Sequence, residues 1–229
     1  MMGVPPNTVH MVENVNAKSF IWPSYVDVIE DVMPWMQFPV GSLAGADLSK
    51  LQLLTDMTCQ WAQRKMGQPL APTAFFQRFD GWTGWNGASV LLPYCPVLQV
   101  LQVNEYWGIS GPHLLVEQTP TNDVDGYTLN YTTGRLTRAF PGLVQKPWFP
   151  GNRNIEIAWV AGWNPIPADW KVATLEMIAH WWRNTQQTQR TNVRGGPGDE
   201  AEAVANGMWE GVPLRIVNLL ESAVRISIA

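Results

Sequence analysis

The chain has few residues whose types and spacing could support catalysis, and the clearest pair lies in the segment EMIAH. Glu176 and His180 are four residues apart, which would place both on one helix face as two ligands of a metal ion. No HExxH motif and no third His or Cys cluster accompanies them. An exposed helix pair or an interface contact is therefore the favoured interpretation.

Other catalytic arrangements are also missing. His10 falls in an expected loop and His113 at a strand edge, and no His is placed to activate Cys95 as a nucleophile. The chain lacks GxSxG and Walker motifs, and GGPGDEAEA has neither the Lys nor the preceding strand of a phosphate-binding loop. The sequence predicts no catalytic residue, no metal site, no cofactor and no enzymatic activity.

The two cysteines, Cys59 and Cys95, lie in apolar surroundings. Two buried free thiols in a reducing compartment are favoured over a disulfide or a metal site.

The segment FDGWTGWNG raises the possibility of a binding surface. Trp82 and Trp85 stand among glycines and could offer flat faces to sugars or to another protein, or could simply cover a sheet edge. A Trp-rich carbohydrate- or receptor-binding module therefore remains an alternative function.

Two long helices are expected to carry these features. The first spans 47–66, with Asp47 as its cap and Gly67 as its end, and the second spans 167–187, with Pro167 in its first turn. A shorter helix is expected between Pro23 and Pro34. We expect core or subunit packing from five large side chains of the long helices: Trp61, Trp170, Met177, Trp181 and Trp182.

Between the long helices, residues 85–163 have strand-like patterns separated by turn signals such as SGPH and DVDG. In VLQVLQVNEY, Gln99 and Gln102 break strict alternation, which predicts a bulge or twist. The expected fold is α+β: a helical bundle with an antiparallel sheet inserted between its two main helices, and an extended C-terminal arm.

The two ends of the chain have a different character. Residues 1–46 form an N-terminal extension with the short helix, and the polar, glycine-punctuated residues 188–208 are expected to be a flexible linker. Residues 209–229 regain apolar character, with a short helix expected from Pro213 to about Val224. Such a tail fits an arm that docks on a partner, through Trp209, Val212, Pro213, Leu214, Arg215, Val217, Leu219, Leu220 and Arg225.

Composition narrows the function class. Hydrophobic residues make up 46% of the 229 residues and charged residues 15%, which favours a surface partly covered by other subunits. A net charge of −4 argues against a dedicated nucleic-acid-binding protein. No secretory leader and no stretch of 18 apolar residues is expected to direct the chain to a membrane.

The order of several motifs resembles the head-to-tail connector (adaptor) proteins of tailed bacteriophages. LLPYCPVLQV is followed by YTTGRLTR and then by NIEIAWVAGWNPIPADWKVATLEMIAHWW. The resemblance covers about residues 47–187. In that family a strand ending in an aromatic and Gly passes into a helix through residues matched here by Gly162, Pro165, Pro167, Asp169, Lys171 and Ala173.

The resemblance implies a structural virion protein of the phage neck, made in the host bacterial cytoplasm. It implies an adaptor ring, commonly a dodecamer, that joins the portal to the tail around the DNA channel. Its implied partners are the portal protein, on which the C-terminal arm is expected to dock, the next neck or tail protein (a stopper or tail terminator), copies of itself, and genomic DNA through transient non-specific contact. It implies no membrane partner.

Overall fold

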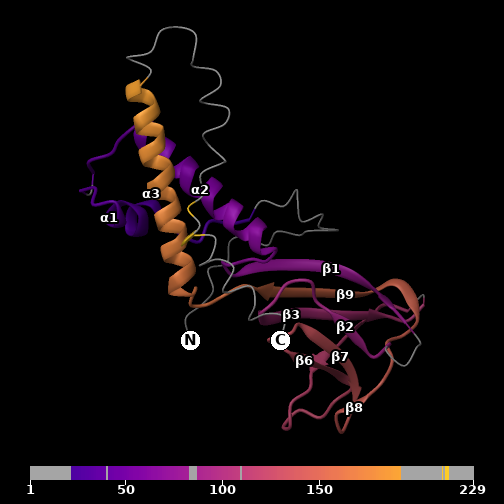
Figure 1. Ribbon diagram of the computed structural model, residues 1–229. Coiled ribbons are helices and arrows are strands. Elements are labelled where there is room, and N and C mark those ends of the chain that lie inside the picture. Colours follow the sequence, from indigo (N-terminus) through magenta and orange to yellow (C-terminus); the bar gives the residue numbers. More distant parts are fainter. Residues whose placement is uncertain are drawn as a thin grey trace. The chain divides into compact units, whose positions relative to one another are not determined.

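The computed structural model describes residues 22–39, 41–82, 87–108 and 110–191, together with Pro213, Arg215 and Ile216. These residues divide into two compact units (Figure 1). The β unit comprises residues 68–164, and the helical unit comprises the described residues before and after it. The predicted α+β class is confirmed, since the described strands all fall between the two long helices in chain order.

The helical unit is formed by η1 (Val28–Val32), α1 (Met33–Trp35), α2 (Ala46–Met66) and α3 (Ala168–Thr191). Helix α2 buries Leu51, Leu54 and Thr58 along the predicted stripe. Gly67 ends it as predicted, because its φ of 69° allows its N–H to bond back to the helix. The predicted cap is wrong: Gly45 is the N-cap, and Asp47 lies in the first turn.

The boundaries of the other helices also differ from expectation. The short helical segment begins at Val28, because the Asp27 carboxylate accepts hydrogen bonds from the N–H groups of Ile29 (2.7 Å) and Glu30 (2.8 Å). Pro34 does not end it but occupies the first turn of α1, where a missing N–H costs nothing. Helix α3 continues to Thr191, four residues into the expected linker.

The β unit contains a four-stranded antiparallel sheet, sheet A. Its order is β1 (Thr73–Gly81), β9 (Gly151–Ala161), β3 (Val97–Tyr106) and β4 (Pro112–Leu114). The predicted sheet began at residue 85 and so missed β1, which pairs with β9 over nearly its whole length. In TAFFQRFDG the aromatic run hides the alternation, and the pairing with β9 decides that the segment is a strand.

Sheet B has the order β2 (Ser89–Leu91), β7 (Arg135–Phe140), β6 (Gly126–Asn130) and β5 (Val116–Glu117), and β8 (Val144–Gln145) also pairs with β7. The pairing of β5 with β6 is parallel and departs from the predicted antiparallel arrangement, which the other named strand pairs follow. The expected strand HLLVEQT is split at Leu115, because β4 pairs in sheet A and β5 in sheet B.

The register of β3 explains the repeat VLQVLQV. Two register shifts against β9, one after Val97 and one after Val100, leave Leu98 and Leu101 as extra residues. Each shift turns the strand so that Val97, Val100 and Val103 all pair with inward-facing residues of β9. The predicted bulges are confirmed. Because of them, every third residue of this segment, and not every second one, pairs with an inward-facing residue of β9.

Candidate functional site

The tryptophans of α3 lie in the core of the helical unit. Trp170, Trp181 and Trp182 are buried, as is Met177. The Trp61 ring, half-buried on α2, meets Trp181 edge-on at 6.4 Å between ring centroids. Within a single chain these residues therefore already hold α2 against α3.

Lys171, one of the motif residues, ties α3 to the N-terminal helical segment. Its ammonium lies 2.5 Å from a carboxylate oxygen of Asp31, and one turn further along α3 the Thr174 hydroxyl bonds to the Tyr25 hydroxyl. This polar seam positions residues 25–31 on α3.

Glu176 and His180 share a helix face but have different partners. A Glu176 carboxylate oxygen lies 3.3 Å from Arg215, and the His180 Nε2 lies 3.1 Å from the Asn184 amide nitrogen. Among the described residues, no group of three or more His, Cys, Asp or Glu side chains could hold a metal ion. The pair has the contacts of a helix surface.

Both cysteines are free thiols. Burial raises the pKa of Cys59 to about 11 and also raises the pKa of Cys95. A raised pKa keeps a thiol protonated and unreactive near neutral pH.

The C-terminal arm is described only at Pro213, Arg215 and Ile216. Ile216 is 2% exposed, and Arg215 forms the ion pair with Glu176. The remaining predicted arm residues, and the predicted linker beyond Thr191, lie outside the described residues. At Ile216 the arm is packed within its own chain.

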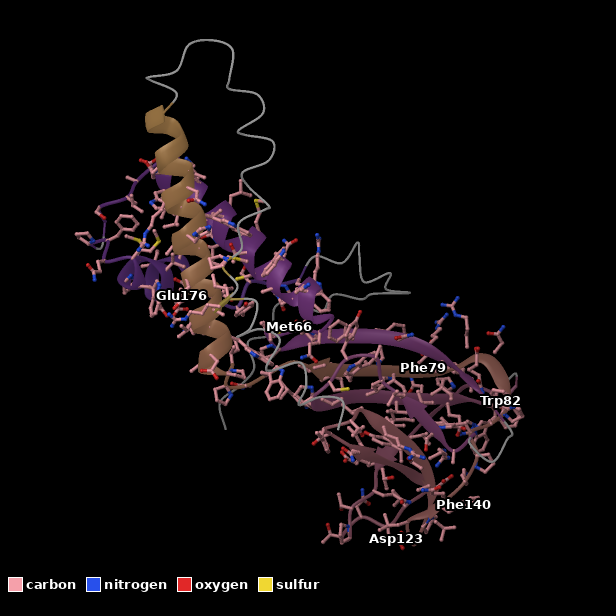
Figure 2. All side chains as sticks on the ribbon, viewed as in Figure 1. Met66, Phe79, Trp82, Asp123, Phe140 and Glu176 are labelled. Atoms are coloured by element: carbon pink, nitrogen blue, oxygen red, sulfur yellow. The ribbon has the colours of Figure 1, made fainter. Side chains whose placement is uncertain are left out.

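Trp82 is 74% exposed at the end of β1 (Figure 2). Trp85 lies outside the described residues.

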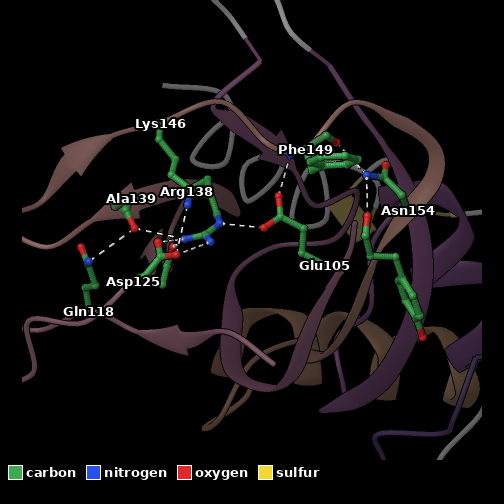
Figure 3. A network of polar contacts seen from close by, with 10 residues as sticks. Glu105, Gln118, Asp125, Arg138, Ala139, Lys146, Phe149 and Asn154 are labelled. Carbon is green, nitrogen blue, oxygen red and sulfur yellow. Dashed lines mark hydrogen bonds and ion pairs between the residues drawn. The ribbon is translucent and has the colours of Figure 1, made fainter. Parts of the chain in front are cut away.

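A buried arginine network joins the two sheets of the β unit, and the sequence analysis missed it (Figure 3). Arg138 on β7 is completely buried. Its Nε donates to Glu105 on β3 at 3.1 Å, and its Nη1 and Nη2 donate to the two carboxylate oxygens of Asp125 at 2.6 and 3.0 Å. The available clue was the alternation Leu136, Arg138 in RLTRAF, which places a charge on the inward face of a strand.

The rest of the network satisfies the remaining polar groups. The other Glu105 oxygen accepts the Phe149 N–H at 2.7 Å, and Lys146 lies 3.0 Å from Asp125. Burial opposes ionisation of Asp125, but the bonds and charges of Arg138 and Lys146 outweigh it and lower its pKa. The network therefore holds its charges in fixed positions and offers no reactive group.

A second polar cluster crosses the outer face of sheet A. The Glu156 carboxylate accepts hydrogen bonds from the Arg78 Nε at 2.7 Å and the Tyr106 hydroxyl at 2.8 Å. Burial raises the pKa of Glu156, but these two donors outweigh it and hold the pKa below its usual 4.5. The hydrogen bond that Tyr106 donates to Glu156 also raises the pKa of Tyr106.

The three residues of this cluster line a cavity of about 450 Å³ with the segment Phe149–Asn154. Arg78 and Glu156 form an ion pair within this lining, and Arg153 adds a second cationic residue to it.

No family model matches the chain, and no curated protein matches its sequence. The structure is similar to a chain in the neck of an empty gene transfer agent (GTA) particle, computed with C6 symmetry. That likeness has a TM-score of 0.52 and 16% identity and covers 85% of this chain and 88% of the other. A chain in the virion of a native GTA particle matches with a TM-score of 0.53 and 16% identity over 89% and 92% of the two chains. At this identity the likeness establishes a shared fold.

None of the described helices combines the length and apolar character that crossing a bilayer requires.

Proposed function

We propose that the chain is a structural subunit of the neck of a phage-like particle. More specifically, we propose a head-to-tail adaptor that assembles as a ring between the portal and the next neck or tail protein, around the DNA channel. The observation that carries this proposal is the fold shared over most of both chains with components of GTA particles, one of them from the neck. The motif order of residues 47–187, which resembles phage adaptors, supports the same role independently.

The proposal assigns no catalytic activity, cofactor or metal to the chain. Glu176 and His180, the two residues considered as metal ligands, contact Arg215 and Asn184 respectively. The DNA contact in the channel would be transient and non-specific, since a net charge of −4 gives little attraction for phosphates.

Particle assembly without this chain tests the proposal directly. When its gene is deleted, we expect DNA-filled heads and free tails that do not join, and we expect the purified chain to restore joining in extracts. Normal joining without the chain would refute the proposal. Signal on a glycan array that is lost in Trp82→Ala would instead favour the carbohydrate-binding alternative.

The arm requires a more careful test, because Ile216 is buried in its own chain. A chain ending at Ile216 retains this contact and the Arg215–Glu176 ion pair, whereas a chain ending at Val212 loses both. We expect both truncations to lose portal binding in a pull-down, and the Val212 truncation alone to lose stability. Portal binding by the chain ending at Ile216 would contradict a docking role for residues 217–229.

A further inference from the structure

The β unit has an exposed apolar projection, which we call the hairpin tip: Phe140, Leu143 and Val144, with Val124 beside them. These four side chains are 40–59% exposed. Phe140 and Val144 face each other across the β7–β8 pair, and Figure 2 shows Phe140 and Asp123 at one end of the unit.

The backbone of the hairpin tip is held in a costly conformation. Leu143 has a φ of 59°, in the left-handed region that a bulky residue rarely adopts. The preceding N–H, that of Gly142, donates to the Asp123 carboxylate, and the Lys146 ammonium lies 4.1 Å from the centre of the Phe140 ring. Such strain persists where the surrounding contacts maintain it, and it is typical of functional surfaces.

A second apolar surface, the outer strip, lies on the face of sheet A that points away from sheet B. The two bulges of β3 expose Leu98 (37%) and Leu101 (49%). Half-buried Ala158 on β9 and Phe76 on β1 continue the strip across the sheet. Its polar members nearest the leucines, Gln99 and Gln102, are uncharged and can hydrogen-bond to an exposed loop backbone.

We infer that the hairpin tip of one copy of this chain docks on the outer strip of a second copy. The inference rests on the proposed ring. A homomeric ring requires a head-to-tail contact between two different surfaces of one chain, and these two surfaces belong to different sheets of the β unit. One is an apolar turn and the other an apolar strip, and the side chains that define them are uncharged, although Lys146 and Asp123 border the hairpin tip and the Arg78–Glu156 pair lies beside the strip.

The size of the two surfaces fits a ring contact and does not fit a stable dimer. Each offers on the order of 300 Å² of exposed apolar surface, against about 800 Å² per partner in a standard interface. A single contact would therefore dissociate readily. In a closed ring each subunit makes the contact twice, once through each surface.

The test uses the full chain with Leu143→Asp and Leu101→Asp as separate variants, and Leu91→Asp as a matched control. Leu91 is 67% exposed on β2 and belongs to neither surface. Each variant is first checked for an unchanged melting temperature, and ring formation with purified portal is then followed by native mass spectrometry and electron microscopy. We expect roughly tenfold or greater weakening of ring formation for the two test variants and none for the control.

Cysteine pairs provide a second readout that does not depend on loss of assembly. In a Cys95→Ser background, Leu101→Cys combined with Leu143→Cys should form a ladder of covalent oligomers on air oxidation, and either substitution alone should remain monomeric, because dimers of a single variant would show that like thiols pair without the proposed contact.

The outcomes separate this inference from the proposed function. Rings that form equally well in both Asp variants, or loss of rings in Leu91→Asp as well, would overturn the inference and leave the ring proposal standing. If Leu143→Asp forms normal rings that no longer join tails, the hairpin tip binds another virion protein. That result would also overturn the inference. Absence of rings in the unaltered chain would refute the adaptor proposal together with the inference.

Discussion

Replacing Arg138 with Met tests the idea that a buried ion network holds the two sheets together. The substitution keeps much of the side-chain volume but removes the charge that Glu105 faces at 3.1 Å. Glu105 is 1% exposed and would keep the Phe149 N–H as its partner among the described residues. The variant therefore leaves a buried carboxylate without a counter-charge.

The magnitude follows from the burial of the two acidic partners. Removing one member of a buried ion pair typically costs about 3–5 kcal/mol. The side chain of Asp125 is 41% exposed and retains Lys146, so it adds little to this cost. By contrast, Lys146→Met breaks a partly exposed pair and should cost less than about 1 kcal/mol.

Hydrogen exchange measured by mass spectrometry distinguishes a local from a global effect. We expect Arg138→Met to lower protection in peptides covering β7 and β3, with α3 unchanged. A second substitution, Glu105→Leu, should recover part of the loss, because the uncompensated charge is then gone. A cost below about 1 kcal/mol for Arg138→Met, or no recovery in the double variant, would refute the reasoning.

Three further predictions concern pH, the aromatic core and one glycine. The folded-state pKa of Glu156 is lowered, so its contribution to stability is present above about pH 4.5 and is lost as pH falls through the lowered value; pH-dependent melting should flatten in Glu156→Gln. Trp181→Ala should lower the unfolding free energy by about 3–5 kcal/mol in urea titrations, because its side chain is buried. Trp82→Ala, at an exposed position, should cost almost nothing. Equal costs for the two variants would contradict the packing of Trp181 in the core. Gly162→Ala should cost about 1 kcal/mol or more by the same assay, because φ is 132° and an added Cβ would lie 2.5 Å from the Ala71 carbonyl oxygen; an unchanged midpoint would contradict this.

The helices could be predicted from the sequence because their determinants are local. The stripe through Leu51, Leu54 and Thr58 and the ending at Gly67 depend on residues within a few turns. The errors lie at the helix ends: the caps Asp27 and Gly45 were not predicted, Pro34 does not end the first helical segment, and α3 runs on to Thr191. Helical spacing also separated Trp181, which was predicted to pack and is buried, from Trp82, for which an exposed face and a cover for a sheet edge were both left open.

Periodicity and turn chemistry act over short distances, so they were enough to predict the α+β class, the two long helices, most of the strands and the bulged character of VLQVLQV. Three features became visible only in the folded chain: TAFFQRFDG is a strand, HLLVEQT divides between two sheets, and Arg138 is buried. These features depend on partners far along the chain: β9 lies about 80 residues from β1, and Glu105 lies 33 residues from Arg138. Pairing and burial are properties of the neighbours that folding brings together, and no local pattern contains them.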